Sequence, residues 1–587
     1  MKNPKQNRIE LSSLKSFNRK FFDGEEDFTY VGDGSLGGKA QGLAFATHLL
    51  KNNISENEFP GVVINIPKMV VLTTSCFDNF MRLNKLYDIA YSNEPDNIIA
   101  YKFQEGSLPV DLIGDLRALI AKVNTPLAVR SSSLLEDAMY EPFAGIYGTK
   151  MIPNNQPDTT TRFRKLTEAI KFVYASTFFK EAKDYIKATK NRIKDEKMAV
   201  IIQEIVGFRY DDRFYPTISG VARSYNFYPM GFAKPEEGVV DLALGLGKTI
   251  VDGGVSWTFS PSRPKSKPPF ANVKDMIELT QNKYWVVNMG KPPAYDPIKE
   301  TEYMFEADLT DAEYDGTLKF IASTYDAASD RVKPGIGYPG PRIINFSQIL
   351  EFNIFPLNKI VKKVLDTCEE AVGTAVEIEF AITLDKNDCK PVRFGFLQVR
   401  PMVVSDEKVE IEQEDLSPEK ILLSSKYVLG NGTVDTITDI VYVKPEVFEA
   451  KYSPEIAIEI EKINKSLIDN NKKYLLIGFG RWGSSDPWLG IPVNWGQISG
   501  ARVIVESMFS GMNVELSQGS HFFHNITSFR VLYFSVPAGE QNNIDWNWLK
   551  TNNTVRQTEL KFIKHIELNK PLSVKVDGRK GLGVIFK

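Results

Sequence analysis

A glycine-rich turn near the start of the chain is the feature that most restricts what its first half can fold into. The turn, Val31-Gly-Asp-Gly-Ser-Leu-Gly-Gly-Lys39, leads directly into residues 40–50, where apolar residues recur at helical spacing. Short β-branched runs follow at 62–66 and 69–72, and similar runs alternate with helical segments as far as residue 399. This alternation predicts a mixed α/β (α+β) fold.

Composition and charge exclude several classes of protein. The 587 residues suffice for about three or four domains, and the net charge of -3 argues against a general nucleic-acid binder. Cys76, Cys368 and Cys389 lie far apart, so neither a disulfide scaffold nor a structural zinc site is expected. No apolar run is long enough to span a membrane, and residues 1–19 lack the apolar core of a secretory signal. We therefore expect a cytoplasmic protein that binds neither nucleic acid nor membrane.

Changes in composition suggest where the chain divides. Residues 1–28 have the character of a charged leader, and residues 405–419 form an acidic, apolar-poor segment that we interpret as a linker. Residues 420–587 are then expected to form a separate C-terminal α/β module.

Two motifs in the first half suit phosphate binding. Gly37-Gly-Lys39 stands before the helical segment, where backbone amides and a lysine can approach a phosphate, although the lysine can equally be solvated. An apolar run ends in Arg130-Ser-Ser-Ser133, which offers a guanidinium fork and hydroxyl groups. The alternative for Arg130 is a salt bridge with Glu136 or Asp137.

Two further motifs suit a nucleotide base and a metal ion. Gln203-Glu204-Ile-Val206 follows a strand and can offer hinge groups to a base, or can be ordinary strand. Alternation puts Glu377 and Glu379 on one face of a strand, and Gln398 and Arg400 on one face of another. If these strands pair, carboxylate and amide oxygens converge, as magnesium prefers. The alternative is two solvated strand faces.

The order of these motifs resembles the N-terminal nucleotide-binding region of the pyruvate phosphate dikinase and phosphoenolpyruvate synthase family. The matching segments are Gly37-Gly-Lys39, Val129 to Ser132, Gln203 to Val206, Ser219-Gly-Val221, Gly245-Leu-Gly247 and Leu397 to Pro401. The resemblance extends over residues 30–402.

The resemblance implies an ATP-grasp-like fold with subdomains at 29–235 and 236–404, and an ATP- and Mg2+-dependent phosphotransferase. It assigns phosphates to Lys39 and Arg130, and the loop over them to Gly145 and Thr149. It assigns the adenine to Gln203, Glu204 and Val206, and Mg2+ to Glu379 and Gln398, with Arg400 assisting transfer beside Arg130.

Several positions depart from the family pattern. Lys248 stands where the family has an acidic residue, and Ala-Arg-Ser-Tyr-Asn follows Ser219-Gly-Val221 in place of the usual FT-x-x-P. Residues 384–391 form an apparent hairpin insertion between Glu379 and Gln398. The family's phosphohistidine motif and its barrel are both missing.

The C-terminal third carries its own motifs. Gly478-Phe-Gly-Arg481-Trp-Gly483 matches GxGxxG, but the prolines at 487 and 492 forbid the helix of a dinucleotide site. Arg481 with Ser484, Ser485 and Asp486 can form an acceptor or phosphate site. In Ser517-Gln-Gly-Ser-His521-Phe-Phe-His524, His521 follows small residues and can accept a phosphoryl group, with Arg481 or Arg502 neutralising the charge. The alternative is a pair of packed or surface histidines.

Three functions fit this sequence. The first is an ATP-dependent phosphotransferase with an unidentified acceptor, with His521 as an intermediate carrier. The second is a non-catalytic ATP-binding regulatory or scaffolding protein, which the missing phosphohistidine motif and barrel favour. The third is one subunit of a split synthase whose partner chain carries the second active site.

Overall fold

Two compact units make up the chain. The computed structural model describes residues 10–20, 22–55, 57–134, 136, 145–187, 189, 191–227, 229, 233–266, 273–385, 387, 389–402, 404, 407, 409–411, 417–484, 487–508, 529–537, 544–552 and 554–587. The first unit comprises Met1–Ile186, Asn191–Tyr225 and Glu236–Pro401. The second comprises Lys187–Lys190, Asn226–Pro235 and Met402–Lys587.

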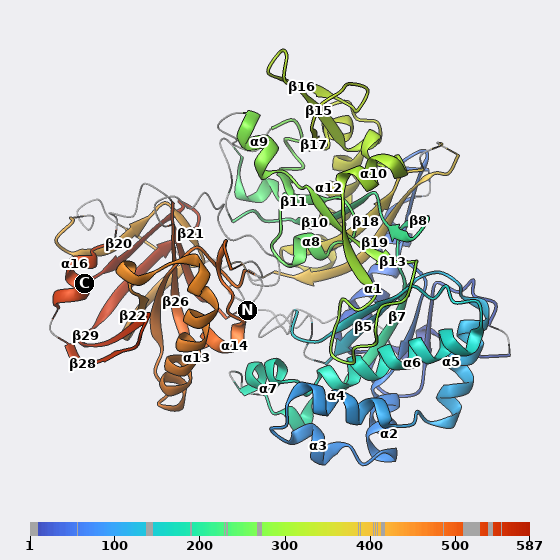
Figure 1. Cartoon of the computed structure of the whole chain (residues 1–587), viewed down its shortest axis with the longest axis horizontal. Coiled ribbons are helices and arrows are strands. Elements are labelled where there is room, and N and C mark those ends of the chain that lie inside the picture. Colours follow the sequence, from blue (N-terminus) through green and yellow to red (C-terminus); the bar gives the residue numbers. More distant parts are fainter. Residues whose placement is uncertain are drawn as a thin grey trace. The chain divides into compact units, whose positions relative to one another are not determined.

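One six-stranded sheet of the first unit has the order β1-β2-β4-β7-β5-β6. Its strands are β1 (Lys15–Ser16), β2 (Phe28–Val31), β4 (Met69–Leu72), β5 (Leu127–Ser133), β6 (Thr149–Ile152) and β7 (Met198–Glu204). Its helices are α1 (Gly37–Asn53), α2 (Thr74–Leu83), α3 (Tyr87–Tyr91), α4 (Asp96–Glu105), α5 (Val110–Lys122), α6 (Thr159–Ser176) and α7 (Lys180–Lys187). Helix α6 packs on β5 and β6, with α4 and α5 against it (Figure 1).

A second six-stranded sheet has the order β12-β11-β10-β18-β19-β3. Its strands are β3 (Val62–Asn65), β10 (Ile218–Arg223), β11 (Val239–Ala243), β12 (Trp257–Phe259), β18 (Val376–Thr383) and β19 (Val392–Pro401). Helix α12 (Leu357–Val372) packs on β10 and β18, and α1 contacts both β19 of this sheet and β5 of the other. Helix α1 therefore connects the two sheets, and one hydrophobic core cluster contains residues of both.

Smaller sheets complete the first unit. A four-stranded sheet has the order β14-β13-β9-β8, and a three-stranded sheet has the order β16-β15-β17. Their strands are β8 (Phe208–Tyr210), β9 (Arg213–Tyr215), β13 (Lys283–Asn288), β14 (Met304–Asp308), β15 (Ala322–Asp326), β16 (Arg331–Pro334) and β17 (Arg342–Ile344). The short helices here are α8 (Lys248–Val251), α9 (Val273–Leu279), α10 (Leu309–Asp315) and α11 (Ser347–Leu350).

The second unit is built on one nine-stranded sheet. Its order is β20-β30-β29-β22-β23-β26-β27-β21, and β28 also pairs with β29. The strands are β20 (Ile421–Ser425), β21 (Tyr427–Leu429), β22 (Gly432–Val443), β23 (Tyr474–Phe479), β26 (Ala501–Ser507), β27 (Leu532–Val536), β28 (Thr554–Glu559), β29 (Ile563–Asp577) and β30 (Leu582–Phe586). Strands β22, β23, β26 and β27 are parallel neighbours, and the others pair antiparallel.

Helices cover both faces of this sheet. The Tyr474 hydroxyl donates to Asn464 of α13 (Ser453–Asp469), so α13 lies on the face to which Tyr474 points. The next residue, Leu475, points to the opposite face and packs in a cluster with Leu549 of α16 (Trp546–Thr551). The short helix α14 (Trp495–Ile498) contacts α13, and the small strands β24 (Arg481–Trp482) and β25 (Gly490–Ile491) pair with each other. The sheet-rich second unit and the first unit together have the mixed α/β character predicted from the sequence.

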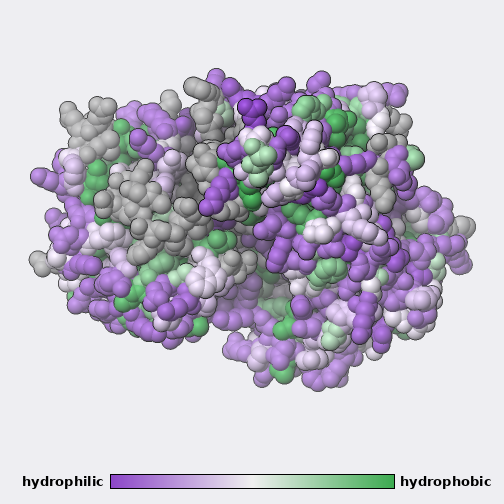
Figure 2. Space-filling view, turned by 45° about the horizontal axis from the view of Figure 1, so that its top comes forward, coloured by the Kyte–Doolittle hydropathy of each residue, from purple (hydrophilic) through white to green (hydrophobic). Residues whose placement is uncertain are grey.

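The surface is predominantly polar on the face shown in Figure 2, where hydrophobic residues appear as small separate groups. Among the helices that the structure describes, none is both long enough and apolar enough to cross a lipid bilayer.

Candidate functional site

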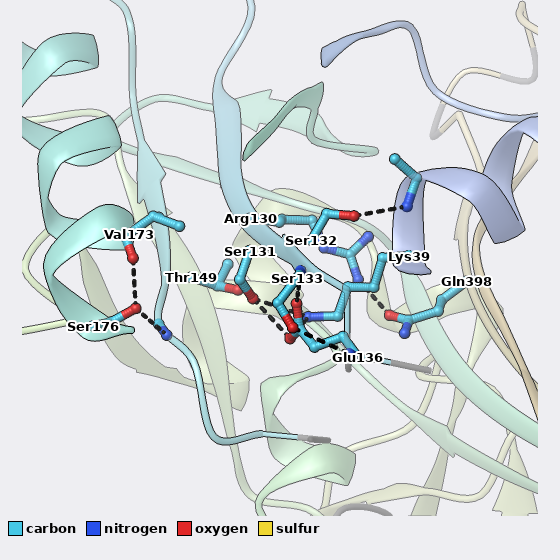
Figure 3. A network of polar contacts seen from close by, with 12 residues as sticks. Lys39, Arg130, Ser131, Ser132, Ser133, Glu136, Thr149, Val173, Ser176 and Gln398 are labelled. Atoms are coloured by element: carbon cyan, nitrogen blue, oxygen red, sulfur yellow. Dashed lines mark hydrogen bonds and ion pairs between the residues drawn. The ribbon is translucent and has the colours of Figure 1, made fainter. Parts of the chain in front are cut away.

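Lys39 lies in the first turn of α1 and is 7% exposed. Its Nζ lies 2.7 Å from Oε1 of Glu136 and donates also to Ser131 Oγ at 3.2 Å (Figure 3). Glu136 is buried and accepts additionally from the Ser131 hydroxyl and from the Ser133 amide. The solvated-lysine interpretation is therefore wrong, because Lys39 belongs to a buried ion pair.

The glycines before Lys39 have a packing role. Gly37 has a φ of +75°, and a Cβ there would lie 1.7 Å from the Ser132 carbonyl oxygen. A Cβ on Gly38 would lie 1.7 Å from the carbonyl oxygen of Glu136. The Ser132 hydroxyl also donates to the Leu36 carbonyl and accepts from the Ala40 amide. The start of α1 is thus packed directly on the end of β5 and on Glu136 just after it, which orients Lys39 toward Glu136.

Arg130 connects three strands of the two large sheets. From β5 its Nη1 donates to Gln203 Oε1 of β7 at 3.2 Å and to the Leu397 carbonyl at 3.0 Å. Its Nη2 donates to Gln398 Oε1 of β19 at 2.7 Å (Figure 3). The same nitrogen lies 3.8 Å from Glu379 Oε2 of β18. Among the described residues, Arg130 forms its ion pair with Glu379, whereas Glu136 pairs with Lys39. Asp137 lies outside the described residues.

The predicted convergence of β18 and β19 is confirmed. The strands pair antiparallel, with Glu377 opposite Arg400 and Glu379 opposite Gln398. Arg400 is 2% exposed, with Nη1 3.3 Å from Glu377 Oε1 and Nη2 3.1 Å from Glu379 Oε1. Two solvated strand faces are therefore excluded.

The polar face continues across the sheet through residues that the sequence analysis did not assign to the site. Arg223 of β10 donates through Nε to Glu377 at 2.8 Å and through Nη1 to Asp241 of β11 at 3.0 Å. Burial lowers the pKa of the Arg223 guanidinium, but the two carboxylates outweigh it and raise that pKa. Asp241, Arg223, Glu377, Arg400, Glu379 and Arg130 form a row of alternating charges that we call the charge ladder. The available signal was alternation along β10, which puts Arg223 on the face of Ser219 and Val221.

The three predicted adenine-contacting residues lie at the end of β7. The amides of Glu204 and Ile205 donate to the carbonyls of Lys68 and Pro126, and the Glu204 carboxylate accepts from the Thr125 hydroxyl. Val206 is buried and packs against Gly395 of β19. The Gln203 side chain is buried and directed to Arg130.

The predicted phosphate loop lies before β6. Gly145 is exposed with a φ of +72°, while the Thr149 amide donates to Glu300 Oε1 at 3.1 Å. Thr149 stands opposite Arg130 in the pairing of β5 with β6. The resemblance places Thr149 in the loop over the phosphates, but its amide already donates to a carboxylate. A phosphate could accept from this amide only if Glu300 moved.

The chemistry of Glu379 and Gln398 fits a magnesium ion. Both offer side-chain oxygens, and Oε1 of Glu379 is buried without a hydrogen-bond donor in the described part of the chain, although Arg400 lies close. The described residues contain no group of three or more His, Cys, Asp or Glu suited to a metal. Further ligands would have to come from phosphate oxygens and water.

The residues predicted in the C-terminal third are only partly described. Arg481 begins β24 where β23 ends, and Trp482 packs its ring on Gly478 and donates from Nε1 to the Val505 carbonyl. In the described residues 484 and 487–494, no helix follows the GxGxxG segment, in agreement with the rejected dinucleotide interpretation. Ser485, Asp486, His521 and His524 lie outside the described residues.

Comparison with known proteins adds a family match. Residues 33–420 match the family model described as pyruvate phosphate dikinase, AMP/ATP-binding domain. No curated protein shows a significant sequence match to the chain.

Proposed function

Because this chain belongs to the family of the pyruvate phosphate dikinase AMP/ATP-binding domain, we propose that it is an ATP- and Mg2+-dependent phosphotransferase. The observation that carries the proposal is the convergence of Arg130, Arg400, Glu379 and Gln398 from β5, β18 and β19. Phosphoryl transfer needs positioning and charge neutralisation more than covalent chemistry, and two arginines with an oxygen-ligand pair supply both. The proposal includes an ATP-grasp-like arrangement with subdomains at 29–235 and 236–404, separated from the module at 420–587 by the acidic segment 405–419.

When ATP binds, the donors that now contact side chains of the protein would contact its phosphate groups instead. Arg130 and Arg400 now contact Glu379 and Gln398, and Glu300 takes the Thr149 amide. Phosphate oxygens would become the partners of the two guanidinium groups and of this amide, with Lys39 contributing positive charge from α1. Glu379 and Gln398 would then hold Mg2+, which neutralises charge on the transferred group. The base would lie near Gln203, Glu204 and Val206, and Gly145 near the phosphates.

The experiment that tests this function has two parts. A thermal melt with Mg-ATP should show stabilisation, which reaches about 2.7 kcal/mol at a hundredfold excess over the dissociation constant. ATP labelled at each phosphate, followed by intact mass and product analysis, should show transfer and identify the phosphate that leaves. A melt that millimolar Mg-ATP does not move would refute the nucleotide site.

We further propose His521 as a carrier of the phosphoryl group toward the unidentified acceptor. It follows small residues in the sequence, which leave room for an incoming phosphate. The imidazole would attack the phosphorus of a bound phosphoryl group and displace the remainder of the nucleotide, forming a P–N bond. Acid-labile, base-stable phosphate should then appear on the chain, His521→Ala should remove it, and His524→Ala should not. Turnover without such phosphate would mean direct transfer.

A non-catalytic ATP-binding role is the second candidate. It is favoured by one observation, namely that Lys39, Arg130 and Arg400 are all engaged by carboxylate or amide groups of the chain. In that case Mg-ATP would stabilise the protein against unfolding, but labelled ATP would give no labelled product with any acceptor that is added. Addition of a partner chain of a split synthase would not produce one either.

A further inference from the structure

Three basic side chains gather at one edge of the sheet of the second unit. Lys473 directly precedes β23, Arg502 is the second residue of β26, and Arg530 lies two residues before β27. These strands are parallel neighbours, so their first residues lie at the same edge. Three chain segments therefore bring a positive charge to one place.

None of the three forms an ion pair with a carboxylate within the ranges that the structure describes, whereas their neighbour Lys472 contacts both Asp439 and Glu567. Their charges act on one another instead. Partial burial lowers the pKa of Lys473, and Arg502 lowers it further. Burial likewise lowers the pKa of Arg502, with Arg530 adding to the effect. Cations that repel each other without internal compensation form an environment that favours an anion.

The backbone is irregular at two of these residues. The pairing of β23 with β26 shifts register so that Tyr474 faces Ala501 and Leu475 faces Val503, which leaves Arg502 as the extra residue of a bulge. Bulges redirect side chains and are frequent beside functional sites. Arg530 has a φ of +53°, a conformation that costs a non-glycine residue about 1 kcal/mol. A glycine would adopt this backbone conformation without strain, so we infer that the position is occupied by arginine because of its side chain.

A buried donor without an acceptor among the described residues belongs to Trp495, which is linked to Arg502 through Phe529. Arg502 Nη1 donates to the Phe529 carbonyl at 2.7 Å, and the Phe529 ring stacks on Trp495 with centroids 4.9 Å apart. Trp495 is 4% exposed, and its Nε1 has no acceptor in the described part of the chain. A buried N–H group without an acceptor is costly, and an oxyanion would satisfy it.

We propose that Lys473, Arg502 and Arg530, here called the basic triad, bind a phosphate group of a small phosphorylated molecule, with Trp495 beside it. Two guanidinium forks and an ammonium group match the charge and the several acceptor oxygens of a phosphate dianion. A nucleic acid is a poorer match, because the chain has a net charge of -3. The proposal does not depend on ATP-dependent activity, since all four residues belong to the second unit.

The test uses inorganic phosphate as the probe on the full-length chain. Binding is measured by calorimetric titration at constant ionic strength, with chloride as the reference anion. Arg502→Gln should weaken phosphate binding about tenfold or more, since it removes a charge-assisted contact. Lys570→Gln, which removes an exposed lysine of the same unit, should leave the phosphate affinity unchanged. Arg130→Gln should weaken only the phosphate binding that occurs in the nucleotide site, and so distinguishes the two sites.

Arg530→Gly tests whether a loss of phosphate binding is caused by unfolding rather than by the missing side chain. Glycine adopts the backbone conformation of this residue without strain, so the variant should melt at or above the wild-type temperature while its phosphate affinity falls. Wild-type phosphate affinity in both Arg502→Gln and Arg530→Gly would overturn the proposal. Displacement of phosphate by a single-stranded oligonucleotide at lower concentration than by pyrophosphate would overturn the assignment to a small molecule.

Discussion

Arg400 is the residue whose surroundings bear most directly on transfer, because it is buried and contacts the carboxylates of Glu377 and Glu379. We predict that Arg400→Lys and Glu379→Gln each lower ATP turnover by about 10²- to 10³-fold, the usual cost of one group aimed at transition-state charge. Lysine keeps a positive charge between Glu377 and Glu379 but lacks the fork. Turnover is measured by release of labelled product, and nucleotide affinity by titration.

The conservative changes separate chemistry from folding. Arg400→Ala would leave Glu377 buried without its partner on β19, and a fall in stability would then obscure the result. If either conservative variant turns over ATP at the wild-type rate, its residue has no part in the transfer step.

Lys39 forms a buried ion pair and is also proposed to bind ATP, and a double-mutant cycle can separate these two roles. Lys39→Met and Glu136→Gln should each destabilise the first unit by about 3–5 kcal/mol, because each leaves the other residue buried without its charged partner. The double variant should be more stable than the sum of the two losses predicts. Urea unfolding gives the free energies. A Lys39→Met chain that keeps its stability but loses Mg-ATP binding would instead mean that the lysine serves mainly the nucleotide.

At the scale of elements, the contact of α1 with the end of β5 depends on Gly37. Gly37→Ala combines a positive φ with a Cβ only 1.7 Å from the Ser132 carbonyl oxygen, so α1 would have to move. We expect a loss of more than 3 kcal/mol and weaker Mg-ATP binding. Gly61→Ala is the matched control, since it has a φ of +78° and nothing within 4 Å, and should cost about 1 kcal/mol. Equal losses in urea unfolding would contradict the close-contact explanation.

Local patterns predicted the elements that carry the candidate site. Alternation along 376–383 and 393–399 indicated two strands with polar faces, and β18 and β19 have those faces in one sheet. The register shift after Glu379 was not predictable, because a bulge depends on the partner strand. Helices α6 and α7 are separated at residues 177–179, where no glycine or proline in the sequence signals the break.

Contacts distant in sequence were out of reach of such patterns. Glu136 follows Lys39 by 97 residues, and Glu300 follows Thr149 by 151. Motif order indicated that Lys39 and Thr149 belong to one site, but only tertiary packing decides which carboxylates meet them. Arg223 was missed because it replaces part of a familiar motif, so the comparison that identified its neighbours treated it as a departure.

At the scale of the whole molecule, one buried carboxyl group in each unit should make stability depend on pH, with opposite signs in the two units. In the first unit, Glu196 is 4% exposed, and its carboxylate forms no ion pair with a cation among the described residues. Burial raises the pKa of Glu196 to about 8; a hydrogen bond from Ser133 opposes this shift, and the charge of Glu136 adds to it. The folded state therefore holds a proton that the unfolded state has released, and this unit should lose up to about 1.4 kcal/mol per pH unit between about pH 4.5 and 8.

In the second unit, Asp439 gives the opposite sign. Burial raises the pKa of the Asp439 carboxyl, but hydrogen bonds from His565 and Thr438 and the charge of Lys472 outweigh it and lower that pKa. A depressed carboxyl pKa contributes stability that is complete above about pH 4, the unfolded value, and is lost as the pH falls through the folded value.

Scanning calorimetry from pH 3 to 9 should therefore resolve two transitions, of which only the one raised by Mg-ATP weakens toward alkaline pH. Glu196→Gln should flatten that alkaline loss, because the amide has no proton to release, and it should leave the acid-sensitive transition unchanged. Glutamine has nearly the same shape, so a general loss of packing is not expected. If Glu196→Gln keeps the full alkaline slope, another group of the first unit carries the proton. A single transition at every pH would mean that the units unfold together, and the two pH dependences would then add within one curve.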